Sequence, residues 1–550
     1  MVSVVVLSMA VACSSSEDEG DAAAPAAAPQ AAAAPTAAAP AASAVQEETP
    51  RSGGTLRLGI PEPNSFDPQA TWSVVAGNIA GMYGDVLVSR HPETYEFLPG
   101  GLSTSWEVSD DMLTWTFKLK EGITYHDGVE FDAEAMAASY RHGADVGWVP
   151  KIYLPPEANI FAQDKFTFVI ESPKIYGPML DHISWPAWFI ATAEHHREVV
   201  GEEDYGTQPI GTGAFKFDQW VRGDSASLSR NDDYDWGPGF YENQGAPYVE
   251  GISIKFIEEE ATLNAAVLAE EIDVVYVPNQ FAADLRKDDR FHFFTRESGR
   301  LSAMSMNHES APLDDVTVRK ALMVAVDRDR IIQVMEQGEG FPQFGQVVRA
   351  LPFYDQAFED ESANLNAYDP DTAISLLAEA GWEKGDNDLL MKDGAPLEFT
   401  FIQTGSERNV RMGSLLQAQL QEIGITVNLE TLESATHGSR RKEGDFDLRH
   451  SGYATLTADI LSFFWHPTES SNLDRITDQA FADLLDDARH SLGQDRADAN
   501  LEVQKYFRDM AMVIPLINPN SNTLVNKRVE GFIAHRNSMD WKVNDAWIKE

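Results

Sequence analysis

The stretch that decides the fold class is ISIKFIEEEATLNAAVLAEEIDVVY, residues 252–276. Residues 252–256 alternate apolar and polar side chains, which predicts a β-strand with one buried face. Residues 260–270 then place apolar side chains at helical spacing, and residues 272–276 form a second apolar run of strand length. A strand, a helix and a second strand in this order predict a βαβ unit and hence an α/β protein.

The same order recurs in the second half of the chain. Residues 397–401 alternate as a strand, residues 410–423 have helical spacing, and residues 425–432 form another strand, with a third at residues 446–453. Two βαβ regions so far apart predict two α/β lobes rather than one continuous sheet.

Turn and capping residues place further elements. Asp369 and Pro370 have the types preferred at the cap and first position of a helix, and Gly381 is typical of its end. We expect further strands at residues 56–60, 113–119, 166–170 and 514–516, and further helices beginning at Asp314 or Asp315 and covering residues 478–492 and 495–512.

Composition excludes several classes of protein. Hydrophobic residues make up 43% of the 550, enough for a sizeable core, and about 150 residues per domain would suggest three or four units. The chain has 42 Lys and Arg against 87 Asp and Glu, a net charge of −45, which argues against a nucleic-acid partner. The acidic residues are spread through the chain, so we interpret them as a solvated surface rather than a site for cationic cargo.

The N-terminal residues are typical of a targeting sequence. Residues 4–12, VVVLSMAVA, form an apolar run too short to span a bilayer, and they precede Cys13, the single cysteine. This pattern resembles a bacterial lipobox and predicts a signal peptide at residues 1–12 and a lipid on Cys13 that holds the chain on a membrane face. A secretory leader with an incidental cysteine is the alternative. Residues 13–53 include an Ala/Pro-rich segment that we interpret as an extended linker.

Motifs of catalysis and of metal binding are missing from the sequence. It contains no G-x-S-x-G elbow, P-loop, G-x-G-x-x-G or H-E-x-x-H. The nearest approach to a metal site is Glu194 with His195 and His196, but adjacent helical residues point about 100° apart. We therefore expect no catalytic residue, no metal and no cofactor, and predict that the protein is not an enzyme.

Several stretches of the chain are distinctive as an ordered set. They are GGTLRLGIPEPNSFDP at residues 53–68, MYGDVLV at 82–88, LSTSWEVSDDMLTWTFKLKEGITYHDGVEFDAEAMAAS at 102–139, PIGTGAFKFDQWVRGDSASLSRNDDYDW at 209–236, VRKALMVAVDRDRII at 318–332, YDPDTAISLLAEAGW at 368–382 and LLQAQLQEIGITVNLETLE at 415–433. Together they resemble one protein family, the extracellular solute-binding proteins of ABC importers that include dipeptide-, oligopeptide- and nickel-binding members (family 5). They follow the family's order over nearly the whole chain after the linker.

The resemblance implies an α/β, two-lobed periplasmic-binding-protein-like clamp with mixed sheets flanked by helices and a hinge between the lobes. The first lobe would comprise residues 54–85, 205–299 and 520–550, with residues 86–204 as an inserted subdomain. The second lobe would be residues 300–519, with hinge crossings near residues 301–307 and 518–524.

The resemblance also implies a function. A membrane-anchored monomer would capture a small solute, an oligopeptide or similar polar molecule, and deliver it to an ABC permease from outside the cytoplasm, in the periplasm where an outer membrane exists. An oligosaccharide-binding or sensory member of the same fold is an alternative. A secreted hydrolase is a third possibility, and it would need a nucleophile–base pair or a metal.

Candidate ligand contacts follow from the same comparison. The aromatic candidates are Trp72, Trp185, Trp188 and Tyr453, each of which could instead pack in the core. Asn307 is expected where the family's chain first crosses between the lobes.

Peptide binders of this family neutralise the ligand's amino terminus with an Asp that follows a Trp. By that alignment Tyr453 replaces the Trp and Leu456 occupies the Asp position, which argues against ordinary peptide binding because a buried ammonium needs a carboxylate partner. A small shift in register would let Asp459 serve as the anchor. Sugars need no such ion pair.

Overall fold

The computed structural model describes residues 49–71, 73–145, 150–385, 387–535 and 541–549. The predicted signal peptide, Cys13 and Trp72 lie outside the described residues, as does most of the linker. Within the described residues, no helix is both long enough and apolar enough to cross a membrane.

The first predicted βαβ unit is confirmed. It consists of β10 (Gly251–Phe256), α8 (Glu260–Leu268) and β11 (Val274–Val277). Strand β1 (Thr55–Ile60) lies between β10 and β11 and pairs with both in parallel. Strands β9 (Ser225–Arg230) and β8 (Phe215–Val221) extend this half of the sheet in antiparallel order. We call this half, with its helices, the first lobe.

The second βαβ unit is confirmed as well. Strand β18 (Glu398–Thr404), α14 (Glu407–Glu422) and β19 (Thr426–Leu432) form it, and the two strands pair in parallel. Strand β20 (Leu448–Ala454) pairs with the other edge of β18, also in parallel. With β13 (Arg300–Met306), which runs antiparallel to β20, these strands form the sheet of what we call the second lobe.

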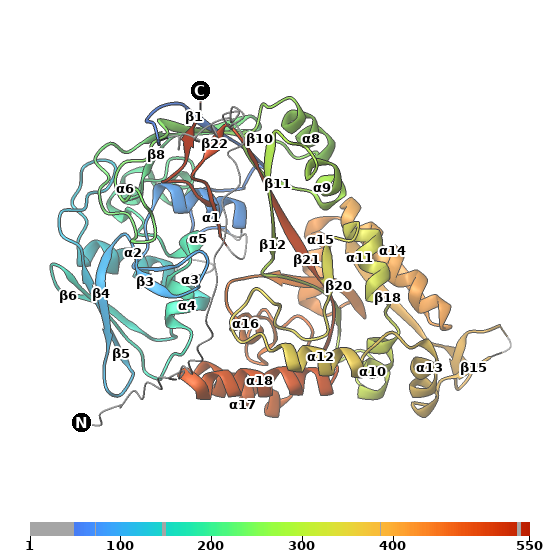
Figure 1. The fold of residues 1–550 in the computed structure, drawn as a ribbon. Coiled ribbons are helices and arrows are strands. Elements are labelled where there is room, and N and C mark those ends of the chain that lie inside the picture. The colour runs from blue at the N-terminus through green and yellow to red at the C-terminus, as the bar shows by residue number, and fades with distance from the viewer. Residues whose placement is uncertain (1–48, 72, 146–149, 386, 536–540, 550) are drawn as a thin grey trace, which may run out of the picture. The chain divides into compact units, whose positions relative to one another are not determined.

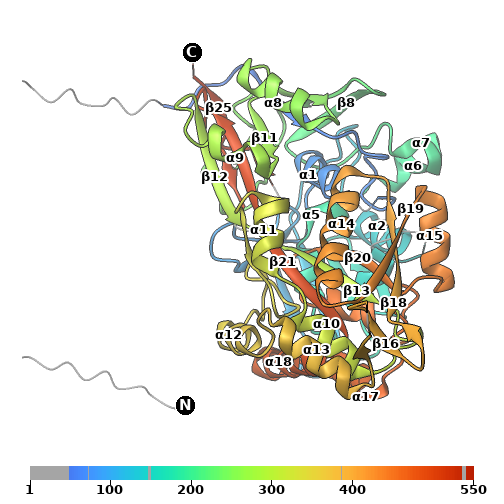
Figure 2. The same cartoon turned by 90° about the vertical axis from the view of Figure 1, so that its right-hand side faces the viewer.

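One long strand joins the two lobes and corrects the expectation of separate sheets. Strand β21 (Val513–Asn526) has 14 residues, where a short strand at residues 514–516 was expected. Its first half pairs with β13 and β14 (Gly340–Pro342), and its second half with β11 and β12 (Phe291–Glu297). The sheet order is therefore continuous, β19-β18-β20-β13-β21-β11-β1-β10-β9-β8. Figures 1 and 2 show β21 running from one lobe into the other.

The chain crosses between the lobes a second time at Ser298 and Gly299, which separate β12 from β13. The two crossings are tied together by side chains. Asn518 on β21 donates from Nδ2 to the carbonyl oxygens of Ser298 at 2.9 Å and Arg300 at 2.7 Å. Ser298 Oγ donates to the carbonyl oxygen of Pro519. Hinge motion would therefore involve a narrow segment with defined hydrogen bonds.

An antiparallel sheet of four strands, in the order β4-β5-β7-β6, lies within residues 86–204. It comprises β4 (Ser103–Val108), β5 (Thr114–Leu119), β6 (Asn159–Asp164) and β7 (Thr167–Glu171), and α2 (Ala133–Asp145) packs on it. Phe117, Phe168 and Met136 are fully buried in one hydrophobic cluster, and the ring of Tyr140 on α2 lies 5.4 Å from that of Phe168 on β7. We call residues 86–204 the insert.

Helix signals in the sequence are confirmed where they were strongest. Asp369 caps α13 (Pro370–Glu379) by accepting from the backbone N–H of Thr372 at 3.0 Å, and Asp315 caps α10 (Val316–Val324). The two expected acidic helices are α17 (Gln479–Arg489) and α18 (Gly493–Asp509).

The remaining helices are α1 (Val74–Tyr83), α3 (Pro150–Tyr153), α4 (Met179–Ile183), α5 (Pro186–Phe189), α6 (Glu194–Val200), α7 (Glu202–Tyr205), α9 (Asn279–Leu285), α11 (Arg328–Glu336), α12 (Gln356–Leu365), α15 (Ser434–Glu443) and α16 (Ile460–Trp465). The remaining strands are β2 (Val88–Arg90), β3 (Phe97–Pro99), β15 (Glu383–Lys384), β16 (Leu390–Lys392), β17 (Ala395–Pro396), β22 (Val529–Glu530), β23 (Ile533–Ala534), β24 (Trp541–Lys542) and β25 (Trp547–Ile548).

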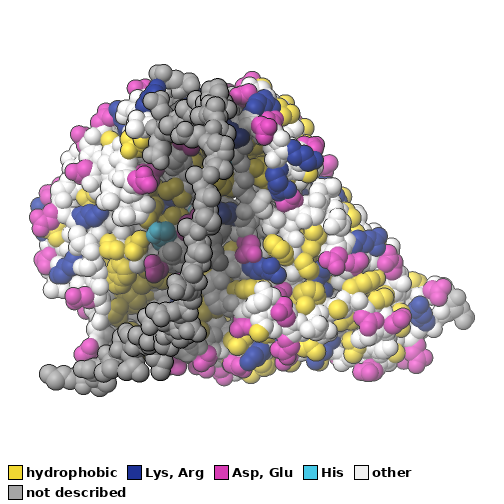
Figure 3. All heavy atoms as spheres, viewed as in Figure 1, with side chains coloured by type: hydrophobic (Ala, Val, Ile, Leu, Met, Phe, Trp, Pro, Cys, Tyr) yellow, Lys and Arg dark blue, Asp and Glu magenta, His cyan; other side chains and the backbone are white. Residues whose placement is uncertain are grey.

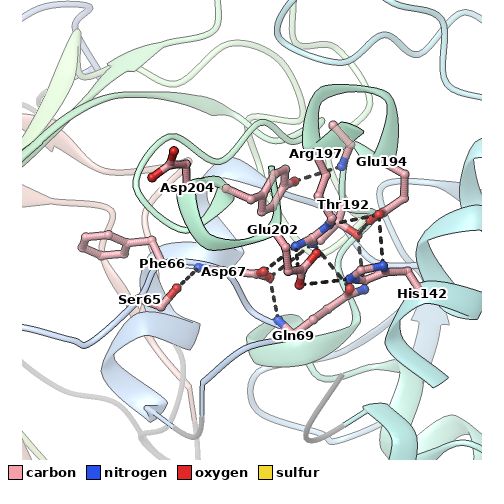
Figure 4. A network of polar contacts seen from close by, with 12 residues as sticks. Ser65, Phe66, Asp67, Gln69, His142, Thr192, Glu194, Arg197, Glu202 and Asp204 are labelled. Atoms are coloured by element: carbon pink, nitrogen blue, oxygen red, sulfur yellow. Dashed lines mark hydrogen bonds and ion pairs between the residues drawn. The ribbon is translucent and has the colours of Figure 1, made fainter. Parts of the chain in front are cut away.

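A buried ion-pair network fixes the loop that follows β1 (Figure 4). Arg197 on α6 pairs with Asp67 (Nη1 to Oδ2, 2.6 Å), Glu194 (3.0 Å) and Glu202 (3.3 Å), and its guanidinium lies over the ring of Tyr205. The side chains of Arg197 and Asp67 are only 5% and 2% exposed. The loop therefore has a defined conformation rather than a free one.

Candidate ligand-binding site

A pocket of about 410 Å³ opens beside the crossing between the lobes. Its volume lies within the range of about 300–1,000 Å³ that is common for small-ligand sites. Residues of β13, β20, α16 and the loop after α16 form most of the wall, and single residues come from α14, α15 and β21. The lining residues are Arg300, Leu301, Ser302, Ser305, Arg408, Arg441, Arg449, His450, Ser451, Gly452, Tyr453, Ala454, Phe464, Trp465, Ser471, Leu473 and Pro519.

The pocket is positively charged although the chain as a whole carries −45. Four arginines and one histidine are among its described lining residues, and no aspartate or glutamate is. Acidic side chains are instead spread over the outer surface, as the face in Figure 3 illustrates. The charge of the pocket wall is therefore opposite in sign to the net charge of the chain.

Two of the four arginines are paired. Arg408, at the start of α14, forms an ion pair with Glu336 on α11. Arg449 Nη2 lies 2.6 Å from Asp474 Oδ1, and the other carboxylate oxygen of Asp474 accepts from Trp465 Nε1 at 2.8 Å. These carboxylates compensate two positive charges and hold the side chains in place.

The other two arginines, Arg300 and Arg441, have no ion-pair partner among the described residues. Burial, together with the positive charge of Arg449, lowers the pKa of Arg441 to about 10. Solvent reaches Arg300, but the protein around it lowers the pKa of its guanidinium, and Arg408 contributes in the same direction. Both groups are still charged at neutral pH, so two positive charges lack a counter-ion.

The pocket also holds unsatisfied hydrogen-bond donors. The Nε atoms of Arg441 and Arg449 are buried and have no hydrogen-bond partner among the described residues. His450 Nε2 shares a hydrogen bond of 2.8 Å with Ser302 Oγ. Burial lowers the pKa of His450 to about 4, helped by the charges of Arg408 and Arg449, so this imidazole is neutral at pH 7. The wall therefore presents two buried arginine donors without acceptors in the described part of the chain.

Of the residues predicted from the sequence, Tyr453 lines this pocket. It is 6% exposed, and its hydroxyl donates to the carbonyl oxygen of Gln346. Trp185 and Trp188 are both 1% exposed, and their ring centroids lie 4.0 Å apart in an edge-to-face contact. Trp188 Nε1 donates to the carbonyl oxygen of Thr71 at 2.9 Å. Neither tryptophan lines the pocket, and their role as ligand contacts stays a prediction.

Asn307 lies beyond the far end of β13, not at the crossing itself. It lines a different pocket of about 380 Å³, together with Glu309, Asp445 and Asp447. Its Nδ2 donates to the carbonyl oxygens of Gly444 at 2.9 Å and Phe446 at 3.0 Å. A ligand contact by Asn307 remains a prediction, although its amide already has two acceptors.

Asp459 takes part in a buried contact between the insert and the second lobe. Arg489 on α17 binds both of its carboxylate oxygens, each at 3.0 Å, and His182 Nε2 on α4 lies 3.5 Å from Oδ2. Burial lowers the pKa of His182 to about 4, so the imidazole is neutral at pH 7. The guanidinium of Arg489 is thus the counter-ion of Asp459 here, and a role for Asp459 in binding a ligand amine stays a prediction.

The histidine pair near α6 has separate partners. His195 Nε2 lies 2.7 Å from Asp127 Oδ2, and His196 Nε2 shares a hydrogen bond of 3.1 Å with the carbonyl oxygen of Gln208. The two rings therefore do not converge on one point.

Sequence reasoning missed the four arginines of the pocket. They come from four separate elements, and each has ordinary neighbours in the sequence. One signal was available: residues 440–442 read Arg-Arg-Lys in a chain with twice as many acidic as basic residues.

The fold is that of a two-lobed binding protein, and comparisons with known proteins agree. The family model described as bacterial extracellular solute-binding proteins, family 5, matches residues 98–474. The chain belongs to this family and is therefore a substrate-binding protein of the ABC importer type.

Two curated relatives and one solved structure illustrate the range of the similarity. The chain is 25% identical over 453 residues to the probable D,D-dipeptide-binding periplasmic protein DdpA of Escherichia coli, covering 79% of this chain and 82% of that one. It is 26% identical over 464 residues to heme-binding protein A of Haemophilus influenzae, with 78% and 81% covered. The oligopeptide-binding protein AppA of Bacillus subtilis, solved with a nonapeptide, superposes with a TM-score of 0.76 at 21% identity, covering 91% of this chain and 100% of that one.

Proposed function

We propose that this protein captures a small polar solute, a peptide or a molecule of similar size, between its two lobes and delivers it to an ABC permease while a lipid on Cys13 holds it at the membrane. It acts outside the cytoplasm, as a monomer. The family membership supports the transport role, and the cargo named for the relatives supports a solute in the size range of short peptides.

The observation that carries this proposal is the position of the pocket. Arg300 is the first residue after the crossing at residues 298–299, and Pro519 lies at the crossing on β21. Both residues line the pocket. A solute bound there touches the segment whose rotation changes the angle between the lobes. Contacts made only in the closed form would shift the population toward closure, and that form would be recognised by the permease.

Two measurements test the proposal. A solute that binds only the folded protein raises its melting temperature by mass action, so a panel of peptides, oligosaccharides and metal chelates should contain members that do so. Deleting the gene should abolish uptake of those same solutes, whereas a Cys13→Ser variant should be released from the membrane fraction. Uptake that is intact in the deletion strain would refute the transport role.

A further inference from the structure

We propose that the pocket selects a solute that carries an oxyanion group, a carboxylate or a phosphate, and that Arg300 and Arg441 are its recognition residues. This inference deepens the proposed function and rests on it. The family match does not specify the charge of the ligand, and the net charge of the chain would by itself suggest cationic cargo.

The first argument is electrostatic. Of the four guanidinium groups on the wall, Glu336 and Asp474 compensate those of Arg408 and Arg449, and the other two have no carboxylate partner in the described part of the chain. Like charges that line one pocket repel one another, and an anion placed between them relieves this repulsion. A cation in the same place would add to it.

The second argument concerns hydrogen bonds. Arg449 is 8% exposed, and its Nε has no partner while its Nη2 is held by Asp474. The Nε of Arg441 is also buried without a partner. A buried donor that lacks an acceptor is costly, and a guanidinium fork matches the two oxygens of a carboxylate or phosphate. The wall therefore provides charge and directed donors but no acidic acceptor of its own.

The third argument concerns the position of the two residues. Arg300 follows the crossing directly, and its carbonyl oxygen accepts from Asn518. Arg441 lies in the last turn of α15, on a different element of the second lobe. An anion that binds both is held against the hinge segment, where binding and closure can be coupled.

The test uses the full chain and three tripeptides that differ only in side-chain charge: Ala-Glu-Glu, Ala-Gln-Gln and Ala-Lys-Lys. Glutarate and glycerol 3-phosphate are two further probes, and comparing them shows whether the pocket binds a carboxylate or a phosphate. Calorimetric titration should show that at least one anionic probe binds, and that Ala-Glu-Glu binds at least about tenfold more tightly than Ala-Lys-Lys. The double variant Arg300→Gln/Arg441→Gln should weaken anion binding by about 10- to 100-fold.

Two controls separate recognition from folding. Arg411→Gln removes an exposed arginine from the same helix as Arg408, outside the pocket, and should leave binding unchanged. The double variant leaves no carboxylate without its partner, so its melting temperature in the absence of solute should not fall. Should it fail to fold, the unmodified protein decides, because Ala-Glu-Glu should bind more tightly than both Ala-Gln-Gln and Ala-Lys-Lys at one fixed salt concentration.

The outcomes keep the two proposals apart. Equal binding of the three tripeptides, or unchanged anion binding by the double variant, would overturn the inference and leave the transport role standing. Anion binding without any loss of uptake in the deletion strain would overturn the transport role alone. Failure of every anionic probe to bind would overturn the inference, and uptake in the deletion strain would still decide the transport role.

Discussion

The ion pair between Asp459 and Arg489 lies within the second lobe and is expected to stabilise this lobe where Asp459 contacts His182 of the insert. The side chains are 4% and 11% exposed, so water screens the pair little. Replacing Arg489 by Met leaves the carboxylate buried, with the neutral imidazole of His182 at 3.5 Å and no arginine or lysine paired with it in the described part of the chain. Removing one partner of a buried ion pair costs about 3–5 kcal/mol, and we expect the free energy of unfolding to fall by that amount.

The complementary variant, Asp459→Asn, leaves Arg489 with Glu469 at 3.9 Å as its nearest carboxylate. We expect a loss of about 2–4 kcal/mol, because an amide keeps a hydrogen-bond acceptor but not the charge. The double variant should lose less than the sum of the two, with a coupling energy above about 1 kcal/mol. Peptide affinity of Asp459→Asn tests the predicted amine anchor separately: a large loss would support it, and unchanged affinity would remove Asp459 from the ligand contacts.

Urea titrations of the four proteins measure these energies. The matched control is Glu422→Gln, which breaks a pair with Arg330 of similar length, 2.8 Å, whose side chains are 48% and 43% exposed. An exposed pair contributes little, so this variant should stay within about 0.5 kcal/mol of the unmodified protein. Additive losses in the double variant, or a loss at Arg489 no larger than that at Glu422, would refute the reasoning.

Three further predictions concern other parts of the molecule. Burial lowers the pKa of His126 to about 4, so the neutral imidazole contributes its full stability above about pH 6.5. This contribution, at most about 3 kcal/mol, is lost as the pH falls toward 4. Urea midpoints measured from pH 7 to 4 should therefore fall, and His126→Gln should make that fall smaller. Arg197→Met should lower the free energy of unfolding by about 3–5 kcal/mol because Asp67 is left buried without its counter-ion, whereas a loss below about 1 kcal/mol would contradict this. Gly452→Ala should abolish the rise in melting temperature that a bound solute causes, because φ is 149° and a Cβ would lie 2.0 Å from the carbonyl oxygen of Leu301 in the pocket wall.

Elements with a strong local pattern were predictable from the sequence. The two βαβ units and the cap of α13 depend on alternation, helical spacing and an Asp-Pro pair, all of which act over a few residues. Strand β21 was predicted too short for a physical reason. Pro515 and Pro519 interrupt the pattern of a central strand, since proline cannot donate to the ladder. The strand continues because β13, β14, β11 and β12 pair with it along its length, and these partners come from distant parts of the sequence.

The binding pocket was less predictable than the fold. Tyr453 could be selected because an aligned family position pointed to it, but aromatic residues also fill cores, as Trp185 and Trp188 do here. The property of the wall that matters for binding is which arginines form an ion pair with a carboxylate and which do not. That depends on Glu336 reaching Arg408 and on Asp474 reaching Arg449, contacts between residues far apart or on separate elements. No spacing in the sequence encodes them.

The pocket attracts an anionic solute, whereas the acidic outer surface repels it. Which of the two electrostatic effects is stronger depends on the distance between the solute and the charges. At physiological ionic strength the Debye length is about 8 Å, so the acidic outer residues repel an approaching anion only weakly. An anion bound as proposed would contact Arg300 and Arg441 directly in a partly desolvated pocket, where the attraction per charge is several times stronger than in bulk water. Lowering the salt concentration extends the repulsion of the surface and slows association, while it leaves the short contacts with the two arginines intact. A net charge of −45 therefore affects how fast an anion arrives far more than whether it stays bound.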